Sequence, residues 1–314
     1  MAKSRPKPLK RTPKKLTDLT PTEFENLIYD LAILRGMVNV AWRTPGADGG
    51  RDIEAATIER DFSGTQTVST WFIECKRYTG SVDWPTIYGK LAYADALQAD
   101  YLLLCTSAKF TPTAITQVDN WNSSRRHVLI RLWPIHEIEM QLRQHPDLSL
   151  KYGMSSAPDT PGGSIVSLAL ALSKAVASNY SEQVFQDMKP SPMLQASQAI
   201  ASLLLKRMED IADVGHIRLS FTKIPDDAVD GCTFQGDFSR IDDMGLRAFA
   251  AYIFALTKQP VQLTSTGDQN CTIVSQNSVA ELLGRYREAF SAIATWSDIE
   301  FTFHSTIIQL RQRQ

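Results

Sequence analysis

The sequence predicts an α/β fold in which a mixed sheet is flanked by helices and followed by a separate α+β domain. Across residues 19–150, helical and strand patterns follow one another in the order α-β-β-β-α-β-α-β-α, which is typical of a sheet with helices on both faces. The apolar run "DYLLLCTS" at 100–107 is typical of a strand covered on both faces. Residues 151–163 are rich in proline, glycine and small polar side chains, which indicates a linker before the second domain at 164–314.

Length and composition bound the class of protein. A chain of 314 residues, 43% hydrophobic and 21% charged, is long enough for two globular domains with cores of their own. The sequence contains no apolar run near the ~18 residues of a membrane span, and its start lacks the apolar segment of a secretory signal. We therefore expect a cytoplasmic protein without a membrane partner.

Residues 1–18 form a basic segment that we expect to be a flexible arm. The first fifteen residues hold seven lysines and arginines and no acid, which leaves the rest of the chain at about −8 because the total is −1. Such an arm can contact nucleic-acid phosphates by counterion release. The alternative on charge alone is a disordered, solubilising tail.

Cysteine and histidine patterns disfavour several kinds of site. Cys75, Cys105, Cys232 and Cys271 lie far apart and form no C-x-x-C pair, so we expect reduced core residues and neither a zinc site nor disulfides. The five histidines are scattered without ligand spacing, which disfavours a histidine metal site or a histidine general base.

The first helix is predicted from the capping residues at its start. Thr20 is placed at the N-cap, Pro21 suits the first helical position, and Glu23 completes a capping box before Gly36 ends the helix. Alternating or apolar runs bounded by turn residues predict the strands that follow, and helical periodicity predicts the helices. The expected elements are a strand at 38–42, a hairpin of strands 51–60 and 68–78, a helix at 83–99, a strand at 100–107, a helix at 111–124, a strand at 127–133 and a helix at 135–145.

The second domain is predicted from the same signals. Apolar positions at helical spacing alternate with shorter strand patterns after the linker. The expected elements are helices at 164–178 and 192–212, a strand "HIRLSFTKI" at 216–224, a helix at 242–258, a hairpin at 261–275, a helix at 277–290 and a strand at 298–304.

One stretch combines charge with an apolar strand. In "WFIECKRYTG", Glu74 and Lys76 are two residues apart and therefore project from the same face of a strand. The preceding hairpin can bring Asp52 beside Glu74. Because Mg²⁺ prefers oxygen ligands and takes one or two carboxylates together with substrate phosphate oxygens, this set predicts a site for a divalent cation and a phosphodiester.

These pieces resemble the PD-(D/E)xK nuclease superfamily, and more narrowly its Mrr-type restriction endonuclease domain. The resemblance covers about residues 19–145 and rests on D-x21-E-C-K together with its flanking segments. The matching segments are "LTPTEFENLIYDLAILRGM", "TPGADGGRDIE", "FIECKRYTGSV" and "ADYLLLCTSAKFTPTAITQV". The resemblance implies a restriction-endonuclease-like fold.

The resemblance also implies roles for individual residues. It makes Asp52 and Glu74 metal ligands together with the backbone carbonyl of Cys75, Lys76 the catalytic lysine, and Glu25 an acidic group that supports the metal through water. The implied cofactor is Mg²⁺, for which Mn²⁺ can substitute. An arginine precedes Asp52 where the superfamily's name has proline, and many Mrr domains carry glutamine at the position of Glu74.

The activity implied is that of a Mg-dependent endodeoxyribonuclease, a hydrolase that binds DNA and acts in defence against foreign or phage DNA. The setting is either restriction of modified DNA or the effector step of an antiviral system. Arg77, Tyr78 and Lys109 are candidate DNA contacts, as are Arg125 and Arg126. A homo-oligomer is expected because one such site cuts one strand at a time. The sequence lacks a G-x-x-x-x-G-K-[ST] loop, so any NTP hydrolysis would come from a partner.

Other interpretations remain open. E-x-K alone also occurs as an exposed ion pair at the end of a strand, and Asp48 suits a turn better than a metal. The second domain has no basic cluster, which favours a regulatory, ligand-sensing or oligomerisation role, with an activating ligand or partner protein. The alternative functions are a nuclease for RNA or branched DNA and a catalytically silent nucleic-acid-binding subunit.

Overall fold

The computed structural model describes most of the chain. The described residues are 12–43, 51–78, 80–124, 127–155, 191–221, 224, 229–267, 269–274, 287–304 and 306–313. The predicted helix at 164–178, most of the predicted linker, the first eleven residues of the predicted arm and the predicted start of the helix at 277–290 lie outside these ranges.

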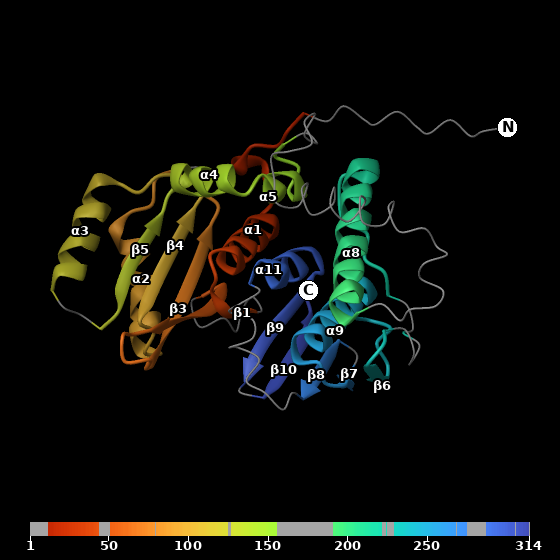
Figure 1. Cartoon of the computed structure of the whole chain (residues 1–314). Coiled ribbons are helices and arrows are strands. Elements are labelled where there is room, and N and C mark those ends of the chain that lie inside the picture. Colours follow the sequence, from red (N-terminus) through yellow and green to blue (C-terminus); the bar gives the residue numbers. More distant parts are fainter. Residues whose placement is uncertain are drawn as a thin grey trace.

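The first sheet has five strands in the order β1-β2-β3-β4-β5 (Figure 1). β1 to β3 pair antiparallel, whereas β3, β4 and β5 pair parallel, so the sheet is mixed as predicted. β3 is the central strand. The strands are β1 (Val38–Trp42), β2 (Ile53–Arg60), β3 (Gln66–Lys76), β4 (Tyr101–Thr106) and β5 (Leu129–Trp133).

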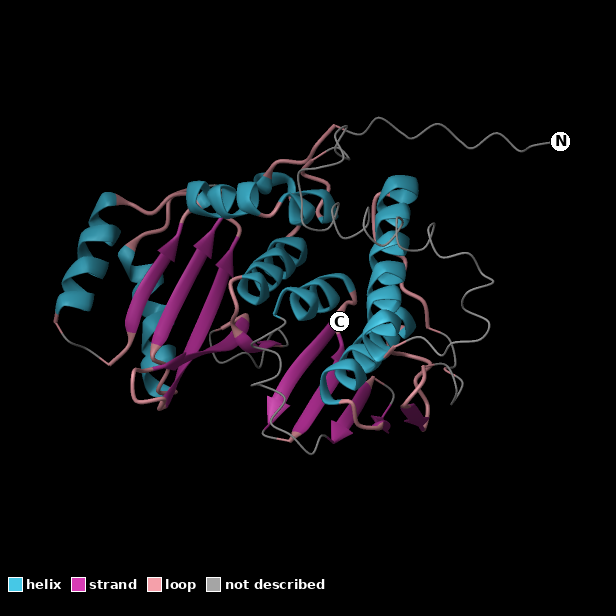
Figure 2. Ribbon diagram, in the orientation of Figure 1, coloured by secondary structure: helices cyan, strands magenta, loops and turns pink. Residues whose placement is uncertain are grey.

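Helices cover both faces of this sheet (Figure 2). Side chains of α2 and α3 share a hydrophobic cluster with one face, and side chains of α1 and α4 share another with the opposite face. The helices are η1 (Leu16–Asp18), α1 (Pro21–Leu34), α2 (Trp84–Ala96), α3 (Pro112–Ser123), α4 (Ile135–Gln144) and α5 (Pro146–Lys151). The sequence analysis did not predict η1 and α5.

The start of α1 shows why a capping signal is informative. The hydroxyl oxygen of Thr20 accepts a hydrogen bond from the Glu23 amide at 3.1 Å, and the Glu23 carboxylate accepts one from the Thr20 amide at 2.7 Å. These two bonds use local backbone donors that the helix itself cannot satisfy. The capping box is confirmed.

A second sheet follows, with strand order β6-β7-β8-β10-β9. Burial alternates along β10, and the helices lie over one face of this sheet (Figure 2). No helix in the described part of the chain is long and apolar enough to cross a membrane. The elements are α8 (Pro192–Val214), β6 (Cys232–Gln235), α9 (Asp243–Thr257), β7 (Val261–Gly267), β8 (Asn270–Val274), α11 (Arg287–Trp296), β9 (Ile299–His304) and β10 (Ile307–Gln312).

The strand predicted at 216–224 is wrong, because residues 217–221 form no strand. The carbonyl of Arg218 accepts a hydrogen bond from Arg207 Nη1 at 2.6 Å, and its amide donates to the buried carboxylate of Asp210 at 3.1 Å. Side chains of α8 thus satisfy backbone groups that a strand would pair with a neighbour. The sequence analysis also missed β6 and β10, and α11 continues beyond the predicted end at 290 to Trp296.

The two sheets meet along β1 and β9. The Trp42 amide donates a hydrogen bond to the Glu300 carboxylate at 3.2 Å, and the Phe303 amide donates to the side-chain oxygen of Asn39 at 2.8 Å. One hydrophobic cluster contains residues of both halves. The two halves of the chain therefore pack against each other along β1 and β9. The division into domains at 151–163 stays a prediction.

A buried polar cluster also joins the two halves. Asp30 of α1 is fully buried, and its carboxylate contacts Lys151 Nζ at 2.5 Å, the Tyr152 hydroxyl at 2.7 Å and Arg313 Nη1 at 2.9 Å. Arg313 follows β10 near the end of the chain. The cluster ties α1 to the end of α5 and to the residue that follows β10, through an aspartate that pairs with two cations.

Candidate active site

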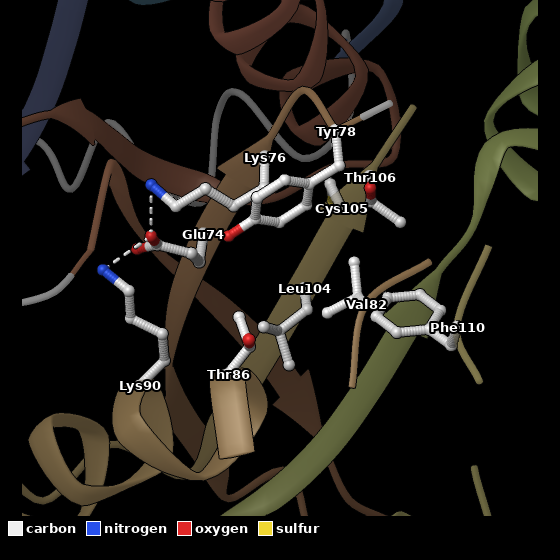
Figure 3. A pocket seen from close by; sticks show the side chains of 10 residues that line it. All are labelled: Glu74, Lys76, Tyr78, Val82, Thr86, Lys90, Leu104, Cys105, Thr106 and Phe110. Atoms are coloured by element: carbon white, nitrogen blue, oxygen red, sulfur yellow. Dashed lines mark ion pairs between the residues drawn. The ribbon is translucent and has the colours of Figure 1, made fainter. Parts of the chain in front are cut away.

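Glu74 is the centre of the candidate site. It lies near the end of the central strand β3, on the face that α2 and α3 cover, and its side chain is only 1% exposed. Burying a carboxylate costs several kcal/mol unless a cation or hydrogen-bond donors compensate. Lys76 supplies one cation, because its Nζ lies 2.7 Å from Oε1 of Glu74 (Figure 3). The geometry confirms that the two side chains point the same way.

A second lysine reaches the same oxygen. Lys90 Nζ lies 2.7 Å from Glu74 Oε1 and approaches from α2, so that two ammonium groups flank one buried carboxylate (Figure 3). The sequence analysis missed this residue. The signal was weak: Lys90 follows the buried Ile87 by three positions and so borders the buried face of its helix, but only the packing of α2 on the sheet shows what it meets.

Asp52 lies next to Glu74 across the hairpin. β2 and β3 pair Ile53 with Ile73, which places Asp52 opposite Glu74 immediately before β2 begins. Its Oδ2 accepts a hydrogen bond from the Cys75 amide at 2.6 Å. Burial and the neighbouring charge of Glu74 raise the pKa of Asp52 to about 6. The structure thus brings the three predicted residues of the core motif together.

Glu25 contributes a third carboxylate to the same region. It lies half-buried on α1, and burial raises the pKa of its carboxyl group above the ordinary value. Its carboxylate lies near enough for the charges of Lys76 and Glu74 to influence that pKa. Partial burial lowers the pKa of Lys76, but its contact with Glu74 and the charge of Asp52 outweigh burial, so that pKa lies above its ordinary value. The lysine is therefore held as a cation.

The oxygen atoms present suit a hard divalent cation. Oε2 of Glu74 is buried and has no hydrogen-bond partner among the described residues, so it is available as a ligand. Asp52 and Glu74 together offer the one or two carboxylates that Mg²⁺ takes in proteins, with water and phosphate oxygens completing the octahedron. Within the described ranges, no three His, Cys, Asp or Glu side chains are grouped closely enough to hold a metal by themselves. A bound metal would thus depend on these two carboxylates, a backbone carbonyl, and water or substrate.

The predicted DNA contacts differ in their surroundings. Arg77 is exposed, but its Nη1 donates to the Leu19 carbonyl at 2.8 Å, which ties the guanidinium to the segment before α1. Tyr78 lines the hollow beside Glu74 and Lys90 (Figure 3), and Lys109 is exposed near the same strand ends. Their role in DNA binding stays a prediction. Asp48, Arg125 and Arg126 lie outside the described residues.

The four cysteines are buried and free. Cys75 and Cys105 pair across β3 and β4 below the site, and burial raises the pKa of the Cys75 thiol well above its ordinary value. A neutral, buried thiol is a poor nucleophile and a poor metal ligand. The Cys75 side chain packs in the hydrophobic cluster on the face of β3 opposite Glu74, so its sulfur points away from the site, and the role of its backbone carbonyl as a ligand stays a prediction.

Comparison with known proteins gives a family match for the first half of the chain. Residues 16–140 match a family model described as restriction endonuclease, Mrr_cat, which is less than half of the chain. No curated protein sequence matches.

Two solved structures are similar in part. The DNA modification-dependent restriction endonuclease AspBHI shares 14% identity at a TM-score of 0.31, over 46% of this chain and 42% of that chain. The MspJI restriction endonuclease in complex with a 27-mer oligonucleotide shares 17% identity at a TM-score of 0.33, and the similarity covers 44% of this chain and 30% of that chain. This chain spans less than half the length of either. The family match spans the candidate site, so residues 16–140 are similar to an Mrr-type restriction endonuclease domain.

Proposed function

We propose that this protein is a metal-dependent DNA endonuclease that hydrolyses phosphodiester bonds. The observation that carries the proposal is the buried Glu74, which lies opposite Asp52 at the end of the central strand and has Lys76 within 2.7 Å. An ion pair that only stabilises the fold would need neither the carboxylate of Asp52 nor the buried Oε2 of Glu74, which has no hydrogen-bond partner among the described residues. A metal-dependent phosphodiester hydrolase would use both as metal ligands.

Each residue has a distinct task in this proposal. Asp52 and Glu74, with the Cys75 carbonyl, hold Mg²⁺ or, in its place, Mn²⁺. When bound, the cation polarises the scissile phosphate and acidifies a ligated water. Lys76 keeps its positive charge beside Asp52 and Glu74 and stabilises the negative charge that develops on the phosphate. Glu25 supports the site through water. The resemblance to PD-(D/E)xK nucleases implies 3′-hydroxyl and 5′-phosphate ends as products.

Purified protein is expected to cut supercoiled plasmid or phage DNA when Mg²⁺ is present and to leave it intact in EDTA. Glu74→Gln keeps the size of the side chain but removes its charge, so it should abolish cleavage and lower the affinity for Mn²⁺. Gel electrophoresis measures the first effect and electron paramagnetic resonance of free Mn²⁺ measures the second. Cleavage by Glu74→Gln at the wild-type rate would contradict the proposal.

Metal binding should depend on pH through Asp52. Since the pKa of this carboxyl group is about 6 in the metal-free protein, Asp52 is ionised above that pH and protonated below it. A proton and a cation compete for the same oxygens, so Mn²⁺ affinity should fall about fivefold as the pH drops from 6 to 5. Titrations at pH 7, 6 and 5 measure this. An Asp52→Asn variant should bind more weakly and lose most of this pH dependence; an equal slope in both proteins would assign the titration to another group.

The biological setting we propose is defence against foreign or phage DNA. The match of residues 16–140 to a restriction endonuclease family supports this setting. Phage plating on cells that express wild-type or Glu74→Gln protein tests it. Cleavage only of RNA or branched DNA would favour the alternative nuclease, and tight nucleic-acid binding without cleavage in any metal would favour a silent binding subunit.

An activating ligand and a homo-oligomer are further parts of the proposal. A polar cavity of about 570 Å³ lies between β1–β2 and the second sheet, and Arg43, Glu54, Glu300, His304 and Arg311 are among its lining residues. Its volume is that of a small-molecule site. The Arg43 amide also donates to the carbonyl of Asp52 at 2.8 Å, so a ligand in the cavity would contact a residue that is hydrogen-bonded to one of the proposed metal ligands. Two copies would bring two such sites to a duplex, as a double-strand cut requires.

A further inference from the structure

The unusual feature of the site is that two lysine side chains contact the same carboxylate oxygen of Glu74. Lys76 Nζ and Lys90 Nζ each lie 2.7 Å from Oε1 of Glu74, so the two ammonium groups are at most twice that distance apart. Like charges this close repel each other, and one lysine suffices to neutralise one carboxylate. The second lysine therefore needs another explanation.

The two lysines are not held equally. Lys76 also interacts with the charge of Asp52, so two carboxylates retain it. Among the described residues, Lys90 forms an ion pair with Glu74 alone. Lys90 comes from α2 rather than β3, and its side chain is 26% exposed against 35% for Lys76, so both ammonium groups border solvent. Lys90 is therefore the more weakly held of the two, because it has one carboxylate partner where Lys76 has two.

Ligation of a divalent cation by Glu74 changes this balance. Two positive charges added beside Glu74 repel both lysines. The lysine with a single carboxylate partner then loses the larger share of the attraction that holds it in place. An ammonium group on a flexible four-carbon stem that is released towards solvent is suited to bind a phosphate as a point charge. The DNA backbone supplies phosphates next to the scissile bond.

We infer that Lys90 holds Glu74 in the metal-free protein and moves to a phosphate of the DNA backbone when Glu74 ligates a divalent cation. This inference rests on the proposed function and adds a residue to it. Lys90 thereby weakens metal binding in the absence of DNA and strengthens DNA binding once metal is bound.

The test uses the full-length protein and the variants Lys90→Gln and Lys90→Arg. Removing the competing charge should tighten Mn²⁺ binding without DNA by several-fold in Lys90→Gln, measured by electron paramagnetic resonance, whereas Lys90→Arg keeps the charge and should stay near wild type. With a fluorescent 30-base-pair duplex in Ca²⁺, Lys90→Gln should bind about tenfold more weakly, and its slope of log affinity against log salt should be smaller by about one. In EDTA, wild type and Lys90→Gln should bind the duplex alike.

Lys206 provides a matched control. It too pairs with a buried carboxylate, at 2.9 Å from Asp210, but it lies on α8 outside the site. Lys206→Gln should change neither metal affinity nor DNA affinity. Unchanged or weaker Mn²⁺ binding by Lys90→Gln, in a protein whose wild type binds Mn²⁺ through Glu74, would overturn the inference and leave the nuclease intact. A wild type that binds no metal at all would overturn both.

Discussion

Replacement of Lys76 by glutamine is expected to lower the cleavage rate by about 10²–10³-fold while leaving the fold intact. The lysine lies 2.7 Å from Glu74 and stays protonated, so its loss removes a fixed positive charge from the place where the transition state gains negative charge. Glu74 retains Lys90 as a partner, which should keep the unfolding midpoint near that of wild type. Single-turnover cleavage of plasmid DNA at saturating Mg²⁺ measures the effect.

Lys76→Arg separates charge from position. The guanidinium keeps the charge but is larger and planar, so it cannot occupy the same place as a compact ammonium group. We expect partial activity, between that of wild type and that of Lys76→Gln. Full activity in Lys76→Gln would show that the lysine pairs with Glu74 for stability alone, and the catalytic assignment would then have to be withdrawn.

The second large effect concerns stability. Asp30→Ala is expected to lower the free energy of unfolding by about 3–5 kcal/mol, because it leaves Lys151 and Arg313 buried without their shared counterion. These side chains are only 9% and 3% exposed, so water cannot replace the carboxylate. Urea denaturation followed by circular dichroism measures the loss.

Two further variants make this prediction specific. Asp213→Ala removes one partner of an exposed ion pair and should cost about 1 kcal/mol or less. Combining Asp30→Ala with Arg313→Met removes the carboxylate and one of its cations together, and it should recover part of the lost stability. A double variant less stable than Asp30→Ala would mean that Arg313 stabilises the protein mainly through its contacts with Tyr29 and the Ala294 carbonyl.

The sequence predicted best where a local rule decides the structure. The capping box of Thr20 and Glu23 needs only four consecutive residues, and the alternation of side chains along a strand places Glu74 beside Lys76 whatever surrounds them. The long hairpin between Asp52 and Glu74 extended this reasoning, since antiparallel pairing brings both ends together. These features needed no information about distant parts of the chain.

Prediction failed where distant groups compete for the backbone. "HIRLSFTKI" alternates like a strand, yet Arg207 and Asp210 of α8 bind the backbone carbonyl and amide of Arg218, which a sheet neighbour would otherwise pair with. Two described strands, β6 and β10, were not predicted. β6 has only four residues and pairs with β7, which lies about 30 residues further along the chain. A period-two pattern states which side chains could share a face, but not which partner will pair with the backbone.

The sequence by itself therefore determined the class of fold, the order of the strands along the first sheet and the proximity of Asp52, Glu74 and Lys76, because propensity, capping and pleat act over a few neighbouring residues. Only the tertiary structure decided that Lys90 of α2 meets Glu74, that Asp30 of α1 meets Arg313 near the end of the chain, and that β1 packs against β9. The physical reason is that such contacts depend on how helices and sheets pack, and packing is set by the shape and burial of the whole assembled core.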